Sequence, residues 1–550
     1  MKILVKFYSW LANSSFLKSE TSKSYPLSGG GIPVILKQVG NLLILLSLIV
    51  FVPALISALY AEWYSFVGFL LSTVIILFAG LLLILIFRNT PEPHFNHAFL
   101  VVAWGWLALT FAGSLPFYLI AVITPVNAMN GFIPTGANYD VSSLQVFRNY
   151  LHSFFESMSA FTTTGLTMVV HEPSVGKGVL FYRSFAQWVG GAGFIVMALA
   201  IFKFNTGSSG RLLYSSESTG INLRSRVAET ARGIWKSYLI ITVLTVVYLI
   251  AGTKIILPEY AFAENLFDSV NHAFAGLSSG GFSTLDDSIA TYNSVAMDYL
   301  YLLPMILGSF SLPFYYRIFF RRKFSEVWND VQTRSLLICF VAGGLILSGL
   351  LYYSQAVKSP FREGIFQYIS AISTTGWQTS NIHIWDDRSF LFIIFFAMFI
   401  GGAWGGTVGG IKIYRAVFAL KAMSWNIRKS FYSQNTFRIM RFDGRVLMPE
   451  QISSEMASVS VFIIAFFIIY LVSTMITTFF LPEEYTIMDA FFESIAAQST
   501  AGLSVGITNP EMHPVVEIIY IFQMWIGRLE IFPVLALFRA FFAGTNPYRS

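Results

Sequence analysis

The segments FESMSAFTTTGLT (residues 155–167), NHAFAGLSSGGFS (271–283), FQYISAISTTGWQ (366–378) and FESIAAQSTAGLS (492–504) decide the fold of this 550-residue chain. They align without gaps on one glycine each, at Gly165, Gly281, Gly376 and Gly502. Small residues recur at a matched offset, at Ser159, Ala275, Ser370 and Ala496. Four such alignments in one chain indicate internal repeats rather than coincidence.

Each segment lies between two long apolar stretches and carries only about ten residues of helical pattern. Ten residues rise ~15 Å, half the thickness of the hydrocarbon core, so the segment is too short to cross a bilayer. We therefore expect a half-helix that enters the membrane and turns back. Irregular backbone at that depth is tolerated only where it is buried in protein or lines a water-filled path. Four such turns can place carbonyl oxygens around one axis, where they replace the hydration shell of a monovalent cation.

The glycine of each segment has a task in this interpretation. Carbonyl groups that all point toward one axis require backbone φ values that glycine adopts at little energetic cost. The alternative is that the small residues only allow helices to approach one another closely. A single TTTG would favour that alternative, whereas four copies in the same context favour the ion path.

The composition identifies a membrane protein. The chain is 55% hydrophobic and 17% aromatic but only 12% charged, and a soluble domain would carry about twice that share of charge. Apolar stretches long enough to cross a bilayer recur along the chain. We expect ten spans, at residues 38–60, 64–87, 98–123, 178–203, 235–257, 295–319, 333–354, 389–420, 456–481 and 514–541.

The charges set the orientation of these spans. With the N-terminus inside, most lysines and arginines fall on the cytoplasmic side, which is the positive-inside pattern. Acidic residues gather on the outer side, where they would raise the local concentration of cations. We expect no signal peptide, and we interpret residues 1–37 as a basic interfacial segment. Topology explains the basic charge, so nucleic-acid binding is not required. The single cysteine, Cys339, is interpreted as a small core residue.

Further motifs resemble the Trk/Ktr/HKT superfamily of potassium transporters, and most closely its TrkH-type subunits. They are QWVGGAGFIV from Gln187, GGAWGGTVGGIK at 401–412 and GRLEIFP at 527–533. The resemblance implies an all-α integral membrane protein with four M1–P–M2 repeats in pseudo-fourfold arrangement, two extra N-terminal helices and four re-entrant pore helices. The implied divisions are 1–37 (N-terminus), 38–96 (extra helix pair), 97–233, 234–330, 331–452 and 453–550 (repeats one to four).

The resemblance also implies the residues that bind K⁺. In repeats one and two these are Thr163, Thr164, Gly165, Ser279, Gly280 and Gly281. In repeats three and four they are Thr374, Thr375, Gly376, Thr500, Ala501 and Gly502. A serine at the first-repeat glycine accompanies sodium permeation in the family, so Gly165 favours potassium. Repeats two and four depart from the Thr-Thr-Gly form, which weakens the expectation of strict selectivity.

A gate is expected below the filter. Residues 389–420 would form a helix of about 48 Å against a core of ~30 Å, so a steep tilt or a break is required. The glycines of this stretch are the expected place, at Gly401, Gly402, Gly405, Gly406, Gly409 and Gly410. Close helix packing is the alternative, because Gly401, Gly405 and Gly409 repeat at four-residue spacing. The resemblance implies an intramembrane loop that obstructs ion flow.

Arg528 lies midway along the last expected span, where a charge normally faces a polar interior. We hypothesise that it projects into the pore below the filter and restrains cations. The alternative is a structural pair with Glu530 or another buried acid, although side chains two residues apart on a helix point in different directions.

Gated potassium uptake is therefore the leading hypothesis, with Na⁺- or H⁺-coupled potassium symport as the alternative. A membrane enzyme is a distant third, because the seven histidines are scattered and no catalytic motif is evident. No inner loop is long enough for a nucleotide-binding domain. The resemblance implies a homodimer in the cytoplasmic membrane, regulated by a TrkA-like nucleotide-binding cytoplasmic ring, with K⁺ as the transported ion and no organic cofactor.

Overall fold

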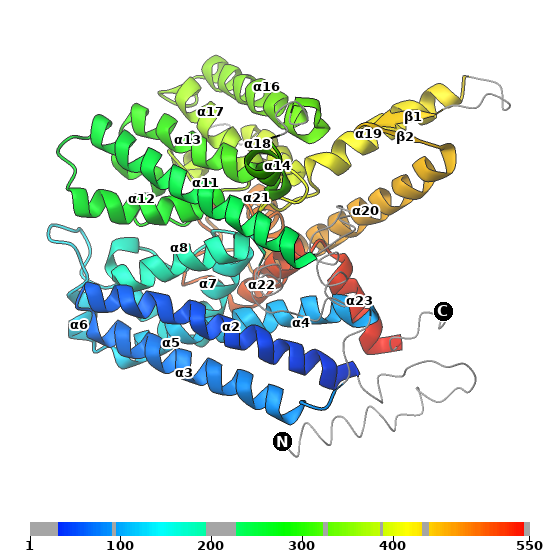
Figure 1. Ribbon diagram of the computed structural model, residues 1–550. Coiled ribbons are helices and arrows are strands. Elements are labelled where there is room, and N and C mark those ends of the chain that lie inside the picture. Colours follow the sequence, from blue (N-terminus) through cyan, green and yellow to red (C-terminus); the bar gives the residue numbers. More distant parts are fainter. Residues whose placement is uncertain are drawn as a thin grey trace.

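The fold is known from a computed structural model, which describes residues 31–90, 95–193, 227–322, 328–385, 389–431 and 439–543. Most of the predicted interfacial segment 1–37 lies outside these residues. Its last part is helical, because the first helix, α2, begins at Gly31 rather than at the predicted residue 38. Helices form most of the described structure (Figure 1).

The N-terminal part is a helix pair packed beside the first of the four segments. Helices α2 (Gly31–Leu59) and α3 (Trp63–Ile86) cross most closely at two glycines, where a Cβ on Gly40 would lie 2.9 Å from the Gly80 carbonyl oxygen. The chain continues through α4 (Phe95–Gly113), α5 (Leu115–Ile123), α6 (Val126–Asn130), η2 (Ser143–Arg148), α7 (Tyr150–Thr162), η3 (Glu172–Val175) and α8 (Lys177–Gly191).

The middle of the chain holds the second and third segments. The elements are α11 (Val227–Ile256), α12 (Phe262–Leu277), η4 (Ser288–Tyr292), α13 (Val295–Ser309) and α14 (Leu312–Arg321). They are followed by α16 (Val331–Ser354), α17 (Pro360–Ile372), η5 (Ile382–Ile384), α18 (Phe390–Ile400) and α19 (Ile413–Lys429). The fourth segment belongs to α20 (Pro449–Phe479), α21 (Ile487–Gln498), α22 (Pro514–Arg528) and α23 (Phe532–Ala543).

Six helices of the described chain are long and apolar enough to cross a membrane, or up to eight if each of two bent pairs counts as one span. The six correspond to the predictions 38–60, 64–87, 98–123, 235–257, 333–354 and 456–481. Only 22% of the most apolar window of α3 is buried inside the protein. An apolar helix with that much exposed surface requires a lipid environment.

The other four predicted spans are not continuous helices within the described residues. Span 178–203 begins as α8, and its residues 194–203 lie outside the described part. Span 389–420 breaks between α18 and α19, at the predicted place. Predicted spans 295–319 and 514–541 are bent pairs, since α13 and α14 meet at 90° and α22 and α23 at 111°.

Local chemistry explains the two bends. Pro313 and Pro533 lie in the first turns of α14 and α23, where a missing N–H is tolerated. The α13–α14 bend frees backbone groups that the 401–412 loop satisfies, since Ala403 N–H donates to Ser309 O and Leu312 N–H donates to Gly405 O, both at 3.0 Å.

A β-hairpin between α19 and α20 was not predicted. Strands β1 (Met440–Phe442) and β2 (Arg445–Leu447) pair antiparallel around Asp443 and Gly444, both at positive φ. An Asp-Gly pair between two strands in which apolar residues alternate is a common two-residue hairpin signal. The hairpin lies with α19 and the start of α20 in a projection beyond the other helices (Figure 1). The described part of the chain is therefore mainly helical with one small sheet, and the all-α expectation missed this hairpin.

Candidate cation filter and the loop beneath it

The four aligned segments meet in a closed ring. The glycine of each segment lies against the carbonyl oxygen of the next segment, and the fourth segment returns to the first. A Cβ on the glycine would lie 1.8–2.3 Å from that oxygen at all four contacts, which are Gly165 to Gly280 O, Gly281 to Thr375 O, Gly376 to Ala501 O and Gly502 to Thr164 O. No side chain fits at these glycines, so the backbones approach as closely as main-chain atoms allow.

The backbone of each segment follows the same course. The second residue before the glycine is left-handed, with φ between 51° and 57° at Thr163, Ser279, Thr374 and Thr500. The glycine two residues later is also at positive φ, between 72° and 95°. Alternation of this kind turns successive carbonyl groups of a strand toward one side. Sequence reasoning assigned the unusual φ to glycine alone and missed these hydroxyl residues, although a left-handed conformation costs them roughly 1 kcal/mol each.

Equivalent hydrogen bonds hold each turn. The N–H of the residue before the glycine donates to the carbonyl five residues earlier, in the pairs Thr164 to Ser159, Gly280 to Ala275, Thr375 to Ser370 and Ala501 to Ala496, at 2.8–3.0 Å. The preceding N–H donates to the carbonyl three residues earlier, at 3.1–3.2 Å. Together these bonds form a Schellman cap. The small residues noted in the sequence are therefore the acceptors of the first bond.

The four short helices end at the ring. Helices α7, α12, α17 and α21 contain 13, 16, 13 and 12 residues and end one or two residues before the left-handed position. A helix C-terminus carries a partial negative charge. Four of these ends around one ring favour a cation there.

The loop between α18 and α19 lies directly beneath the ring and touches all four segments. Thr407, which is fully buried, bonds to Ser279 Oγ at 2.7 Å, and its carbonyl accepts from Thr163 Oγ1 at 3.4 Å. Gly409 N–H donates to Thr374 Oγ1 at 3.3 Å, and a Cβ on Gly409 would lie 2.0 Å from Ser499 O in the fourth segment. The loop thus covers the hydroxyl groups at the base of the ring.

The glycines of this loop have loop conformations. Gly401, Gly405 and Gly410 have positive φ values of 68°, 81° and 75°, and the backbone from 401 to 412 is not α-helical. The alternative of a continuous helix packed through glycines at four-residue spacing is therefore wrong. Of the other three, Gly402 and Gly406 pack against Ser309 O and Phe310 O of the α13–α14 bend, and Gly409 lies under the ring.

Arg528, at the end of α22, is hydrogen-bonded to the loop and to α8, the helix that follows the first segment. One guanidinium nitrogen donates to Thr407 O and to Thr163 Oγ1. The other donates to Gly190 O at 2.6 Å and Gly191 O at 2.9 Å. The positive charge therefore lies between the base of the ring and the loop.

Glu530, in the α22–α23 bend, forms buried ion pairs with the start of α19. Its carboxylate lies 2.5 Å from both Lys412 Nζ and Arg415. Glu530 and Ile531 have positive φ values of 58° and 65°. A positive φ is uncommon for any residue other than glycine, and it is a clear outlier for the β-branched Ile531. The bend and the loop are thus joined at two places, Arg528 with Thr407 and Glu530 with Lys412 and Arg415.

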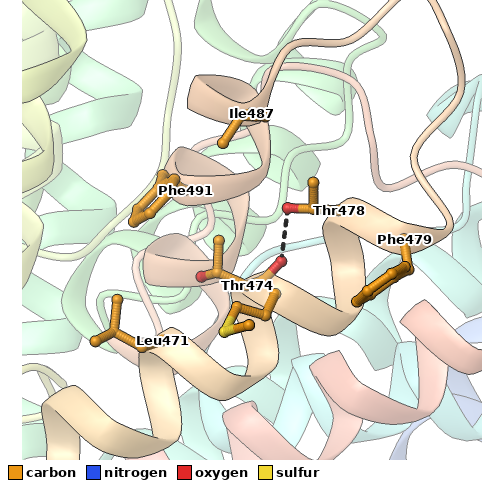
Figure 2. A pocket seen from close by; sticks show the side chains of 7 residues that line it. Leu471, Thr474, Thr478, Phe479, Ile487 and Phe491 are labelled. Atoms are coloured by element: carbon orange, nitrogen blue, oxygen red, sulfur yellow. Dashed lines mark hydrogen bonds between the residues drawn. The ribbon is translucent and has the colours of Figure 1, made fainter.

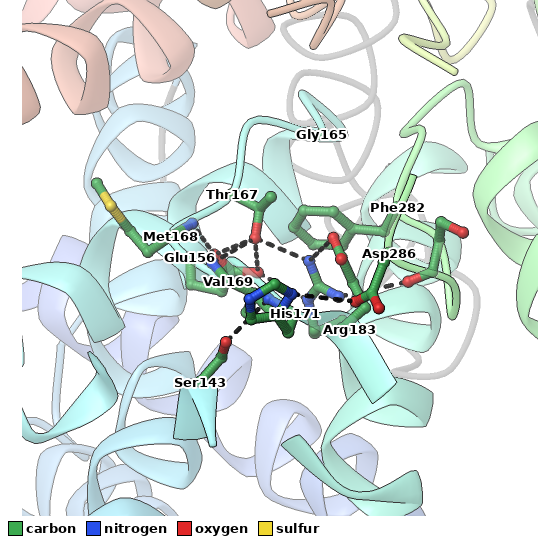
Figure 3. A network of polar contacts seen from close by, with 12 residues as sticks. Ser143, Glu156, Gly165, Thr167, Met168, Val169, His171, Arg183, Phe282 and Asp286 are labelled. Carbon is green, nitrogen blue, oxygen red and sulfur yellow. Dashed lines mark hydrogen bonds and ion pairs between the residues drawn. The ribbon is translucent and has the colours of Figure 1, made fainter. Parts of the chain in front are cut away.

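A buried ion pair supports the outer side of the ring (Figure 3). Arg183 of α8 lies 2.7 Å from Glu156 of α7, and both side chains are almost fully buried. Arg183 also donates to Thr167 Oγ1 at 2.8 Å and to Ser283 O at 3.4 Å. Arg183 therefore links the outer ends of the first and second segments.

Gln187, the first residue of the QW motif, supports the second segment from behind. Its amide nitrogen donates to Gly280 O at 2.6 Å, and its amide oxygen accepts from Phe282 N–H at 3.2 Å. A carbonyl oxygen has two lone pairs, so Gly280 O retains one for another partner.

Comparisons with known proteins identify the family. The model of the TrkH family, described as cation transport protein, matches residues 66–544. The chain belongs to the TrkH family. The chain is 29% identical over 514 residues to an uncharacterised cation transporter of Methanocaldococcus jannaschii, which covers 93% of this chain and 96% of that protein. It is 28% identical over 529 residues to the Trk system potassium uptake protein TrkH of Halomonas elongata, with 92% and 98% covered.

A solved structure supports the same assignment. The crystal structure of the potassium transporter TrkH from Vibrio parahaemolyticus superposes with a TM-score of 0.75 at 26% sequence identity, covering 93% of this chain and 99% of that chain. TrkH-family proteins are membrane transporters, so the membrane-enzyme hypothesis is excluded and this chain is an integral membrane transporter.

The structure brings together the twelve residues that the TrkH resemblance implied as the filter, and it places Arg528 and the 401–410 glycines directly below them. Four supporting residues were missed, namely Thr407, Lys412, Arg183 and Gln187. The TrkH-like motifs contain three of them and flank the fourth. Their partners lie far away in sequence, so no local pattern reports the contacts.

A separate cavity of about 280 Å³ lies between α20 and α21 (Figure 2). Its lining is apolar except for Thr474 and Thr478, whose hydroxyls donate within their own helix to Tyr470 O and Thr474 O at 2.9 Å. Two hydroxyls in an otherwise apolar lining offer a cation fewer oxygen ligands than the four segments bring together at the ring.

Proposed function

We propose that this chain conducts K⁺ into the cell through the ring of four segments. The observation that carries the proposal is the closed cycle of glycine–carbonyl contacts, which gathers main-chain oxygens and four helix C-termini at one place. Carbonyl oxygens in such a ring replace the water around a dehydrated monovalent cation. Relatives named potassium uptake proteins, at 28% identity over most of the chain, support K⁺ as the ion.

The twelve ring residues are the proposed K⁺ ligands, through their carbonyl and hydroxyl oxygens. The 401–412 loop with its glycines, held by Arg528, is the proposed gate. Support comes from the contacts of Thr407 and Gly409 with all four segments, which leave the loop across the base of the ring. Passage of an ion requires the loop to move, and the Arg528 charge opposes a cation until it does.

No coupled ion is needed for accumulation. The membrane potential supplies ~2.3 kcal/mol per charge per 100 mV, and 1.4 kcal/mol corresponds to a factor of ten. About 120 mV therefore sustains roughly hundredfold accumulation of K⁺. We further propose an inner-membrane location with a cytoplasmic N-terminus, four repeats at the predicted divisions, a homodimer, and regulation by a separate TrkA-like nucleotide-binding ring.

The test is ion flux in reconstituted vesicles, comparing K⁺, Rb⁺ and Na⁺. Gly165→Ser should abolish the preference for K⁺, because a Cβ would meet Gly280 O. Gly136→Ser is the matched control, since Gly136 has a similar φ of 89° but nothing within 4 Å of an added Cβ. A wild-type chain that carries Na⁺ as readily as K⁺ would refute the proposal. Flux that depends on an imposed Na⁺ or pH gradient would favour the symport alternative.

A further inference from the structure

A second set of equivalent residues lies behind the ring and differs from segment to segment. In three segments, a buried side chain of the short helix bonds to the hydroxyl eleven residues later, which is the second residue after the filter glycine. Glu156 accepts from Thr167 Oγ1 at 3.0 Å, His272 Nε2 bonds to Ser283 Oγ at 3.1 Å, and Glu493 accepts from Ser504 Oγ at 2.7 Å. We call these three bonds struts, because each joins a short helix to the outer end of its own filter segment.

The two carboxylate struts hold more than one group. Glu156 also accepts from Met168 N–H at 2.9 Å and pairs with Arg183 (Figure 3). Glu493 accepts from Val505 N–H at 2.9 Å and from the N–H and hydroxyl of Thr508 at 3.0 and 2.6 Å. Each carboxylate therefore fixes the backbone just beyond its glycine as well as the hydroxyl.

The strut of the second segment is a histidine held on both sides. Tyr301 OH bonds to His272 Nδ1 at 3.1 Å, opposite the bond from Nε2 to Ser283. The imidazole of His272 is completely buried and cannot rotate without losing both bonds.

The third segment lacks a strut. Gln367 occupies the equivalent position and is fully buried, but neither its amide oxygen nor its amide nitrogen has a hydrogen-bond partner among the described residues. Gln378, the residue that a strut would hold, donates instead to Ser504 O of the fourth segment at 2.9 Å. The third segment is held to its own helix only one residue earlier, where Ser370 Oγ donates to Trp377 O at 2.7 Å, and Gln378 is attached to the fourth segment.

Selectivity depends on how far the ring can contract, because Na⁺ is smaller than K⁺ and requires shorter distances to the same oxygens. We propose that Glu156, His272 and Glu493 are positioning residues that prevent this contraction, and that Gln367 leaves the third segment without a restraint at this position. The inference rests on the proposed K⁺ conduction. It assigns part of the selectivity to side chains that do not touch the ion.

The test measures the K⁺/Na⁺ flux ratio in vesicles for Glu493→Gln, Ser504→Ala and the double variant. Loss of a buried hydrogen bond corresponds to about a tenfold fall in the ratio for each single variant. Glu493→Gln also weakens the bonds to Val505 and Thr508, so its ratio should fall at least as far as that of Ser504→Ala. The double variant should fall little further than Glu493→Gln, because the two changes share the bond to Ser504. Ser504→Thr, which keeps the hydroxyl, should retain the wild-type ratio.

Gln367→Met is the matched control, because it changes the equivalent position where no bond exists. Its ratio should stay within about twofold of wild type. Unchanged ratios in Glu493→Gln and Ser504→Ala, in a protein whose ratio Gly165→Ser still changes, would overturn the inference but not the proposed function. If Glu493→Gln fails to fold, Ser504→Ala against Ser504→Thr carries the same test.

Discussion

The ring consists of four equivalent segments, whereas the structure beneath it consists of one loop and one bend without repeats. In the ring, four segments make the same caps, adopt the same left-handed turns and contact one another in the same sense. Beneath it, one loop from residues 401–412 and one bend at 529–531 cover all four segments. Conduction of a spherical ion requires equivalent oxygens around an axis, whereas closure requires only one obstruction. In the proposed mechanism, a single movement of the loop opens the path without altering the ring.

We expect the largest effect from a substitution in the ring. Gly281→Ala places a Cβ 1.8 Å from Thr375 O, and relief of that overlap requires two segments to separate. We expect K⁺ flux to fall by about a hundredfold, which corresponds to ~2.8 kcal/mol. Gly136→Ala, at similar φ in open space, should conduct normally. Full flux through Gly281→Ala would contradict the close ring.

The joint between the loop and the bend gives the next largest effect. Glu530→Gln leaves Lys412 and Arg415 without their buried carboxylate, and loss of one partner of a buried ion pair costs ~3 kcal/mol. We expect a lower melting temperature in detergent and a raised basal flux. The control is Glu455→Gln, whose carboxylate lies 3.8 Å from the half-exposed Arg445 and should cost less than about 1 kcal/mol. Equal melting temperatures for the two variants would count against the joint.

Removal of the positive charge beneath the ring should change the flux but not the selectivity. Arg528→Ala eliminates the bonds to Thr407 O, Gly190 O and Gly191 O, so the closed position of the loop loses stability relative to the open one. Basal K⁺ flux should rise about tenfold while the K⁺/Na⁺ ratio stays unchanged. Arg441→Ala, on the exposed hairpin, serves as the control. A lower flux at normal expression would refute the gating role.

The smallest expected effect concerns the outer mouth. Burial raises the pKa of Asp286 above its ordinary value, and the nearby His171 lowers it again in part. A raised carboxyl pKa means that Asp286 gains its proton at a higher pH than an exposed aspartate, so acid outside removes a negative charge near the entrance. As the external pH is lowered, K⁺ uptake at low K⁺ should fall by about twofold, beginning at a higher pH than titration of an exposed aspartate would produce.

Asp286→Asn removes that charge permanently. The variant should show the lower uptake already at pH 7 and a weaker dependence on external pH. The result to look for is initial uptake in vesicles with fixed internal pH. An identical pH profile in wild type and variant would show that Asp286 does not control the entrance.

Sequence reasoning reached the features that have local causes. The four segments were found because glycine and hydroxyl residues repeat at fixed offsets, and the break at 401–412 followed from the length of the apolar stretch. The bends at 310 and 530 were missed because the stretches around Pro313 and Pro533 remain apolar across the turn. The contacts of Thr407 with Ser279, and of Lys412 with Glu530, join residues more than 100 positions apart. Only the packed structure reveals them, and only the TrkH resemblance pointed to their region.

Diffraction from crystals grown in Rb⁺, with anomalous scattering recorded at the Rb edge, tests the central claim most directly. The account predicts an anomalous peak on the axis of the ring, bounded by the carbonyl oxygens of Thr164, Gly280, Thr375 and Ala501. A ring without a peak, in crystals that show Rb⁺ bound elsewhere on the protein, would contradict it.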